Sequence, residues 1–164
     1  MKPFLGGVLA FSLAAVAGCD TIQDQNKLLV RRYLEEVVNT GDVDRLAEFI
    51  SEDYVEVYEN TRYVLGLEGA RKHILGGREV YRDLHVTVEQ QIAEGEWVVS
   101  RITARGTHVG AWMGIAPTGK PVEITCVNID RVVGGRIVEH GGAANMLDPF
   151  LKAGAIQAVP PGGG

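Results

Sequence analysis

The strongest constraint on the fold of this chain is a change of hydrophobic period at Leu84. From this residue to His140, apolar side chains alternate with polar ones, which is the pattern of half-buried β-strands. Glycines and other turn residues divide the stretch into four segments, at 84–93, 97–109, 122–133 and 136–140. Consecutive strands joined by short turns pair antiparallel. The second half of the chain is therefore predicted to be a meander of four strands.

The last of these strands is bounded by two glycine pairs. Gly134-Gly135 predicts a two-residue hairpin turn, because glycine readily adopts the positive φ angles of such turns. Side chains alternate along a strand, so His140 and Gly142 share one face. We expect the strand to end at Gly141-Gly142. An imidazole at that point lies either on the rim of a pocket or in a plain turn.

The first half of the chain shows the 3.6-residue period of helices instead. We expect a helix over 25–39 and a second, short helix that begins after Asp42. A third helix is predicted over 67–75, ended by Gly76-Gly77. Before it, the segment 54–58 alternates strictly and predicts a strand.

Helices come first and an antiparallel sheet follows, which is the order of an α+β domain. We expect a curved, cone-shaped antiparallel or mixed sheet with the N-terminal helices packed on one face. A closing helix is predicted over 146–153. A cone of this kind has a mouth, and ligand pockets form at such mouths. With 164 residues, the chain has room for one domain with a substantial core.

The N-terminus has the composition of a secretory signal. Lys2 precedes an apolar stretch over 4–17, which is shorter than a membrane-spanning helix. Val16-Ala17-Gly18-Cys19 resembles the bacterial lipobox, and an ordinary signal peptide with a chance cysteine is the alternative. We expect four regions: a lipoprotein signal peptide (1–18), a tether (19–25), the folded domain (26–156) and a disordered tail (157–164).

The lipobox resemblance implies a lipid-anchored protein. Cys19 would carry acyl chains and hold the protein on the periplasmic or cell-surface side of a bacterial membrane. Asp20, directly after the cysteine, resembles a signal for retention in the inner membrane. Cys126 is then the only remaining thiol, so no disulfide forms within the mature chain. Its apolar strand pattern indicates a buried, inert thiol.

Composition excludes several other classes of function. The formal net charge is −5 and no block of Lys or Arg occurs, so no nucleic-acid partner is expected. The sequence has no glycine-rich phosphate loop and no serine nucleophile elbow. Its four histidines are scattered, so no metal site is predicted. His73 is interpreted as a surface residue of its helix.

Several motifs along the chain are similar to those of one family. They are Asn39-Thr40-Gly41-Asp42 after the first helix, Gly66 to Ala70, Gly106 to Gly110, the loop Gly114 to Val122, and Gly135 to His140. Together they resemble the SnoaL-like polyketide cyclases, or ester cyclases, of the nuclear-transport-factor-2-like superfamily. The resemblance extends over about residues 26–156. It implies an α+β cone with a deep apolar cavity.

The resemblance also implies an activity. Characterised cyclases of this family close a ring in a polyketide ester by an intramolecular aldol reaction, without a metal or an organic cofactor. An aspartate near the end of the final strand acts as acid/base, and a loop histidine helps to bind substrate. His108 matches that histidine, whereas Gly142 stands where the aspartate is expected. His140 is then the best candidate for acid/base work, with a structural histidine as the alternative.

Six further residues are predicted to contact substrate: Tyr54, Tyr58, His108, Trp112, Asn128 and Asn145. Each has a plain alternative. Glu56, between the two tyrosines, could mark that face as solvent-exposed, and His108 could face solvent in a hairpin. Trp112 with Met113 could cap the cavity or form a surface plug or dimer contact. Asn128 fits a cavity lining or an exposed sheet face, and Asp130 is interpreted as a surface charge.

Two functions therefore remain open. The first is a membrane-tethered enzyme that binds or converts a small apolar carbonyl compound by proton abstraction next to the carbonyl group. The second is a non-catalytic ligand-binding or dimeric interaction module of the same fold, which the glycine at position 142 favours. A polar-lined pocket of about a few hundred Å³ would favour the first function, and a filled core the second.

Overall fold

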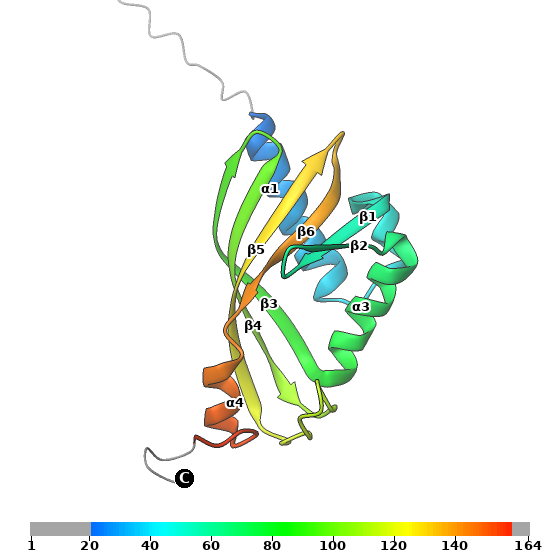
Figure 1. The fold of residues 1–164 in the computed structure, drawn as a ribbon. Coiled ribbons are helices and arrows are strands. Elements are labelled where there is room, and N and C mark those ends of the chain that lie inside the picture. Colours follow the sequence, from blue (N-terminus) through cyan, green and yellow to red (C-terminus); the bar gives the residue numbers. More distant parts are fainter. Residues whose placement is uncertain (1–20, 159–164) are drawn as a thin grey trace, which may run out of the picture.

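The structure of the protein, a computed structural model, describes residues 21–158 and is built on one six-stranded sheet (Figure 1). The strands are β1 (Ile50–Tyr58), β2 (Thr61–Val64), β3 (Tyr81–Glu94), β4 (Trp97–His108), β5 (Pro121–Val133) and β6 (Arg136–Ala144). The helices are α1 (Ile22–Tyr33), α2 (Leu46–Phe49), α3 (Gly66–Val80) and α4 (Leu147–Ala153). Between α1 and α2 the chain forms a π-helical turn (Leu34–Val38) and a 3-10 turn (Val43–Arg45).

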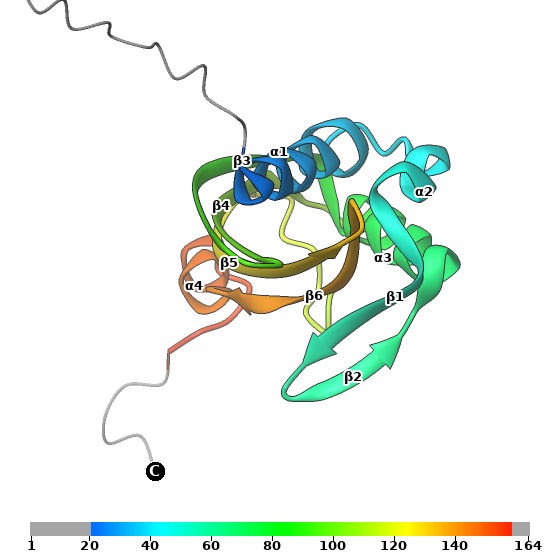
Figure 2. The same cartoon turned by 90° about the horizontal axis from the view of Figure 1, so that it is seen from above.

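The four strands predicted from the period-two pattern form an antiparallel meander. Strand β1 pairs parallel with β6, and β2 pairs antiparallel with β1, so the sheet is mixed and has the order β2-β1-β6-β5-β4-β3. The sheet curls into a cone. Helix α1 packs against β3 and β4 across its opening, and α3 packs against β1 at the side (Figure 2). The predicted α+β class is confirmed.

Glycines supply the positive φ angles that the hairpin turns require. Gly134 and Gly135 have φ angles of 57° and 72°, as the predicted two-residue turn requires. The turn between β3 and β4 consists of Gly95 and Glu96, because Glu94 pairs with Trp97 in the ladder. Gly95 supplies the positive φ there, at 56°.

Helix α1 begins three residues earlier than predicted. The Thr21 hydroxyl accepts a hydrogen bond from the Asp24 backbone N–H (3.2 Å), and the Asp24 carboxylate accepts one from the Thr21 N–H (3.3 Å). This capping box fixes the helix start, although it precedes the apolar stripe from which the helix was predicted. Residues 22–25, expected to be tether, are therefore helical.

The region between the helices contains more regular structure than predicted. Strand β1 begins at Ile50 rather than Tyr54, and β2 occupies part of the expected loop, because the two strands and β6 satisfy one another's backbone groups. Helix α3 continues through Gly76-Gly77 to Val80. Glycine lowers helix propensity by only about 1 kcal/mol, and tertiary packing offsets a cost of that size.

Strand β6 also continues where the sequence predicted its end. Gly142 pairs with Asn128, and Ala144 pairs with Cys126, so the ladder with β5 extends past the second glycine pair. Gly142 has a φ of 149°, and a Cβ atom at this position would collide with the carbonyl oxygen of Val127. The glycine is therefore required by the close approach of the two strands.

Buried apolar side chains form two groups. The larger group lies between the inner face of the sheet and the helical N-terminal segment, and it includes Val37, Phe49 and Ile137. The smaller group lies beneath α4. Together with two aromatic neighbours it forms what we call the closed end, which consists of Tyr81, His108, Val122, Ile124, Phe150 and Ala153.

The predicted signal peptide, Cys19, Asp20 and positions 159–164 of the predicted tail lie outside the described residues. Within residues 21–158, no helix is long and apolar enough to cross a membrane.

Candidate functional site

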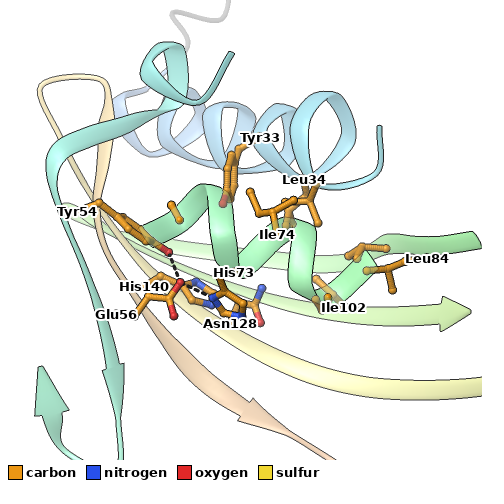
Figure 3. A pocket seen from close by; sticks show the side chains of 14 residues that line it. Tyr33, Leu34, Tyr54, Glu56, His73, Ile74, Leu84, Ile102, Asn128 and His140 are labelled. Atoms are coloured by element: carbon orange, nitrogen blue, oxygen red, sulfur yellow. Dashed lines mark hydrogen bonds and ion pairs between the residues drawn. The ribbon is translucent and has the colours of Figure 1, made fainter. Parts of the chain in front are cut away.

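A cavity of about 180 Å³ lies between the helices and the inner face of the sheet (Figure 3). One part of its wall is apolar, and comes from the π-helical turn, α3, β3 and β4: Leu34, Val38, Ala70, Ile74, Leu84, Val86 and Ile102. The other part is polar, and comes from α1, β1, α3, β5 and β6: Tyr33, Tyr54, Glu56, His73, Asn128 and His140. The cavity is therefore built to hold a largely apolar molecule with a polar group at one end.

His140 is paired with a buried carboxylate. Its Nδ1 lies 2.8 Å from Oδ1 of Asp130, which is its cross-strand partner on β5. Asp130 is 2% exposed, so its interpretation as a surface charge is wrong. The carboxylate orients the imidazole through Nδ1. The other ring nitrogen, Nε2, takes no part in this interaction. The side chain of His140 is 24% exposed, which is enough for a ligand to reach it.

The charge of His140 depends on competing effects. Burial favours the neutral imidazole, but the carboxylate of Asp130 outweighs burial, helped by the more distant Glu56, and the pKa of His140 is raised above its ordinary 6.5. The titratable groups that face this end of the cavity are Asp130 on β5, Glu56 on β1, His73 on α3 and the tyrosines of α1 and β1. A raised pKa makes His140 a stronger base once it is neutral.

Glu56 is the second buried carboxylate of the site and is 3% exposed. It interacts with three side chains: the Tyr58 hydroxyl donates at 2.6 Å, the Tyr54 hydroxyl at 3.3 Å, and Nδ1 of His73 lies 2.6 Å away. Burial alone would raise the pKa of Glu56, but the bonds from His73 and Tyr58 lower it below 4.5. Burial raises the pKa of Tyr54, so this hydroxyl stays protonated and can donate.

His73 reaches the cavity from helix α3, so its interpretation as a plain surface residue is incomplete. Its side chain is 52% exposed, yet it pairs with the buried Glu56 and lines the cavity. A sequence signal for this orientation exists, because Ala70, His73, Ile74 and Gly77 recur at helical spacing and all line the cavity. His73 is the polar member of that stripe, and the stripe was the sign that its side chain reaches the cavity.

The two carboxylate–imidazole pairs are neighbours. Glu56 and His140 are register partners in the parallel pairing of β1 with β6, and both side chains lie on the inner face. Figure 3 shows His140, Glu56, His73 and Asn128 gathered at one end of the cavity, with Leu34, Ile74 and Leu84 farther along it. Two acid/base groups can therefore act on one bound molecule.

Three of the predicted substrate contacts lie elsewhere. His108 is fully buried at the closed end, between the rings of Tyr81 (5.8 Å) and Phe150 (5.2 Å). Trp112 packs on Phe150 at 5.5 Å, and Asn145 bonds to Asp148 at the start of α4. None of the three is among the residues that line the cavity.

The other three predicted contacts lie at or beside the cavity. Tyr54 and Asn128 line it. Tyr58 is 46% exposed and reaches the site indirectly, through its bond to Glu56. Within the described part of the chain, no group of three or more His, Cys, Asp or Glu side chains is arranged to hold a metal ion.

The four helices and the curled six-stranded sheet match the architecture of the nuclear-transport-factor-2-like proteins. The sequence profile of the SnoaL-like polyketide cyclases matches residues 28–151, and the chain belongs to this family.

Named relatives and solved structures agree with this membership. The aklanonic acid methyl ester cyclase of Streptomyces peucetius is 27% identical over 137 residues, which cover 82% of this chain and 94% of that protein. A candidate SnoaL-like polyketide cyclase from Jannaschia sp. CCS1 has a TM-score of 0.73 and 26% identity, covering 87% of this chain and 100% of that one. AclR of Streptomyces galilaeus, a candidate hydroxylase, has a TM-score of 0.71 and 29% identity over 85% of this chain and 91% of that chain. Similar folds thus carry different names, so the residues of the site must decide the chemistry.

Proposed function

We propose that this domain converts a small, largely apolar carbonyl compound by removing a proton next to the carbonyl group, with ring closure as the outcome. The observation that carries the proposal is the pairing of His140 with the buried Asp130 at the polar end of an otherwise apolar cavity. Neutral His140 is the base and acts through Nε2. Asp130 is a positioning residue, because its carboxylate accepts a hydrogen bond from the Nδ1–H of His140 and fixes the ring.

The chemistry suits this arrangement. Removal of a proton next to a carbonyl group generates an enolate, and an enolate carbon can attack a second carbonyl group in the same molecule to close a ring. The imidazolium formed on His140 is stabilised by the Asp130 carboxylate at 2.8 Å. Cyclase activity in the named relatives supports the reaction class, since they share most of their length with this chain.

The size of the cavity limits the substrate. A cavity of about 150 Å³ lined by apolar side chains takes up benzene, so a cavity of about 180 Å³ suits a compound of comparable size. The apolar wall and the polar end together favour a compact ketone or ester over a charged metabolite.

The experiment that tests the base is exchange of the protons next to the carbonyl group of cyclohexanone in heavy water, followed by proton NMR. We expect His140→Gln to lower the protein-catalysed rate by about 10²–10⁴-fold, the usual contribution of a positioned acid/base group. His85→Gln is the matched control, because His85 lies exposed on β3, away from the cavity. Equal rates in wild-type protein and His140→Gln would remove His140 from the catalytic role.

The glycine at position 142 supports the alternative, a non-catalytic ligand-binding module. A Cβ atom there would collide with the backbone of β5, so the aspartate expected from the family has no room in this sheet. This alternative requires that cyclohexanone bind without exchange of its protons. Saturation-transfer NMR on the same samples measures the binding separately from the exchange.

We further propose that the domain is tethered to a membrane through Cys19. The lipobox-like residues 16–19 support this, and Cys19 precedes the Thr21 cap by only two residues. Expression of the full chain in a bacterium, followed by membrane fractionation, tests the tether. Wild-type protein should sediment with membranes and Cys19→Ser should be soluble. Retention of Cys19→Ser in the membrane fraction contradicts the anchor.

A further inference from the structure

The geometry points to Glu56 and His73 as the second half of the acid/base apparatus. We propose that His73 donates the proton that quenches the alkoxide formed when the ring closes, and that Glu56 is the positioning residue that orients it. This inference rests on the proposed function and adds a proton donor to the base already assigned. It also gives a role to a helix histidine that the sequence pattern placed on the surface.

The first support is the environment of Glu56. A carboxylate that is 3% exposed is costly unless it is fully partnered. Here two tyrosine hydroxyls and one imidazole surround it at 2.6–3.3 Å. A structural ion pair between β1 and α3 would need only one such partner, and nothing in it would require the group to face a cavity. Glu56 does face the cavity, at its polar end.

The second support is the position of Glu56 relative to His140. On β6 itself, Gly142 leaves no space for a side chain beside His140. Glu56 approaches the same end of the cavity from β1, the strand that pairs with β6 on its other side, and it is the register partner of His140. A carboxylate therefore lies beside His140 on the neighbouring strand.

The third support is the difference in exposure between the two imidazoles. The side chain of His73 is 52% exposed, whereas that of His140 is 24% exposed. A proton donor must be recharged from water after each turnover, and His73 is accessible enough for that. The deeper His140 is better placed to meet the enolisable carbon among the apolar side chains.

The protons and electrons of the reaction balance. His140 Nε2 takes the proton next to the first carbonyl group, and the C–H electron pair becomes the enolate. The enolate carbon forms a bond to the second carbonyl carbon, and the electrons of that C=O bond move to its oxygen. Nε2 of protonated His73 gives its proton to this alkoxide. His140 then releases one proton to water and His73 regains one, so the product is an isomer of the substrate.

The reverse reaction offers a test with a defined probe. Diacetone alcohol is a compact β-hydroxy ketone, and its cleavage to acetone needs a base at the hydroxyl group and an acid at the carbon. Microscopic reversibility assigns these steps to His73 and His140 respectively. Exchange of cyclohexanone protons, in contrast, needs His140 alone. The two probes therefore separate the two histidines.

We expect His73→Gln to lower the cleavage rate by about 10²–10⁴-fold and to lower cyclohexanone exchange far less, so that the ratio of cleavage to exchange falls by at least about tenfold. Glu56→Gln keeps the shape of the residue and removes its charge, so it should lower kcat for cleavage with little change in KM. His140→Gln should lose both cleavage of diacetone alcohol and exchange of cyclohexanone protons. His85→Gln should retain both reactions. Thermal unfolding of each variant accompanies the assays, so that rates are compared only between folded proteins.

The outcomes distinguish this inference from the proposed function. Loss of exchange as well as cleavage in His73→Gln, or loss of neither, overturns the assignment of His73. Wild-type protein that exchanges cyclohexanone protons but does not cleave diacetone alcohol also overturns it, and leaves His140 as the base. Wild-type protein that catalyses neither reaction contradicts the proposed function itself.

Discussion

The cavity and the closed end each hold an inward-facing histidine, and the two differ in every property that matters for chemistry. His140 has a buried carboxylate at 2.8 Å and adjoins an open volume. His108 is fully buried between aromatic rings, its Nε2 has no partner, and its nearest polar contact is a long one, 3.4 Å from Nδ1 to the Thr118 hydroxyl. The first imidazole has the surroundings of the base that we propose, and the second fills space.

This contrast teaches that the polar partners of a buried histidine, rather than its burial, indicate function. At the cavity, both carboxylates and both imidazoles are paired, and each pair joins two different elements of the fold. At the closed end, the Tyr81 hydroxyl and Nε2 of His108 lie among aromatic and aliphatic neighbours and lack polar partners. We therefore expect substitutions at the cavity to change activity and substitutions at the closed end to change stability.

The largest expected effect on stability is at the closed end. Phe150 is 2% exposed and contacts both His108 and Trp112, so Phe150→Ala should lower the free energy of unfolding by about 3–5 kcal/mol. Exchange of cyclohexanone protons should stay within about twofold of wild type at a temperature where the variant is folded. Urea denaturation and NMR measure the two quantities. A large loss of exchange in folded Phe150→Ala would show that the two ends are coupled.

The next effect concerns the pH dependence at the cavity. Burial lowers the pKa of His140, but Asp130 overcompensates and raises it above 6.5. The base must be neutral, so the exchange rate of the wild type should rise with pH through this raised pKa. Asp130→Asn removes the charge, so the rising limb should move to lower pH, and the plateau should fall at least about tenfold as the ring loses its orientation. A pH–rate profile of Asp130→Asn with its rising limb at the same pH as in the wild type would contradict the pairing of His140 with Asp130.

The same pair also makes stability depend on pH. Because the folded-state pKa of His140 is raised, its contribution is fully present below about pH 6.5 and is lost as pH rises through the folded-state pKa. Wild-type protein should lose this contribution to the free energy of unfolding across that range, and Asp130→Asn should not. Urea denaturation at several pH values on either side of the raised pKa compares the two proteins.

Much of the fold was predictable from the sequence, because its signals are local. The alternation from Leu84 onward and the glycine pair at 134–135 specify the meander and its last hairpin. Other features depend on distant partners. The parallel pairing of β1 with β6 joins residues more than eighty positions apart, and the Gly76-Gly77 step remains helical only through tertiary packing. No local pattern shows either feature.

The candidate site was predictable to a smaller extent. His140, Asn128 and Tyr54 were predicted site residues, each with a plain alternative left open, and all three line the cavity. Asp130 and Glu56 were harder to recognise, since a buried carboxylate cannot be distinguished from a surface one without knowing its partner on another strand. His108 was expected at the cavity from the family resemblance, and Trp112 from its place in the following loop, but the chain beneath α4 closes around both.

A matched pair of alanines sharpens the comparison. Ala70 lines the cavity and is 2% exposed, and Ala153 belongs to the closed end and is 4% exposed. Ala70→Leu should place its larger side chain in the open volume, blocking cyclohexanone exchange with a stability change below about 1 kcal/mol. The leucine of Ala153→Leu has no such space, so this substitution should lower the free energy of unfolding by about 1–3 kcal/mol. Exchange of cyclohexanone protons should continue. Similar stability losses in both variants would show that the cavity closes in solution.

The smallest expected effect is at His108 itself. Its buried Nε2 has no partner, so the imidazole carries a desolvation cost that no strong hydrogen bond offsets. Leucine has a similar volume and no polar atom, so His108→Leu should change the free energy of unfolding by less than about 1 kcal/mol, in the direction of greater stability. Exchange should be unaffected, in contrast to the same substitution at His140, which removes the base. A loss of more than about 2 kcal/mol in His108→Leu would mean that a bound polar molecule satisfies this ring, and the closed end would then be a second polar site.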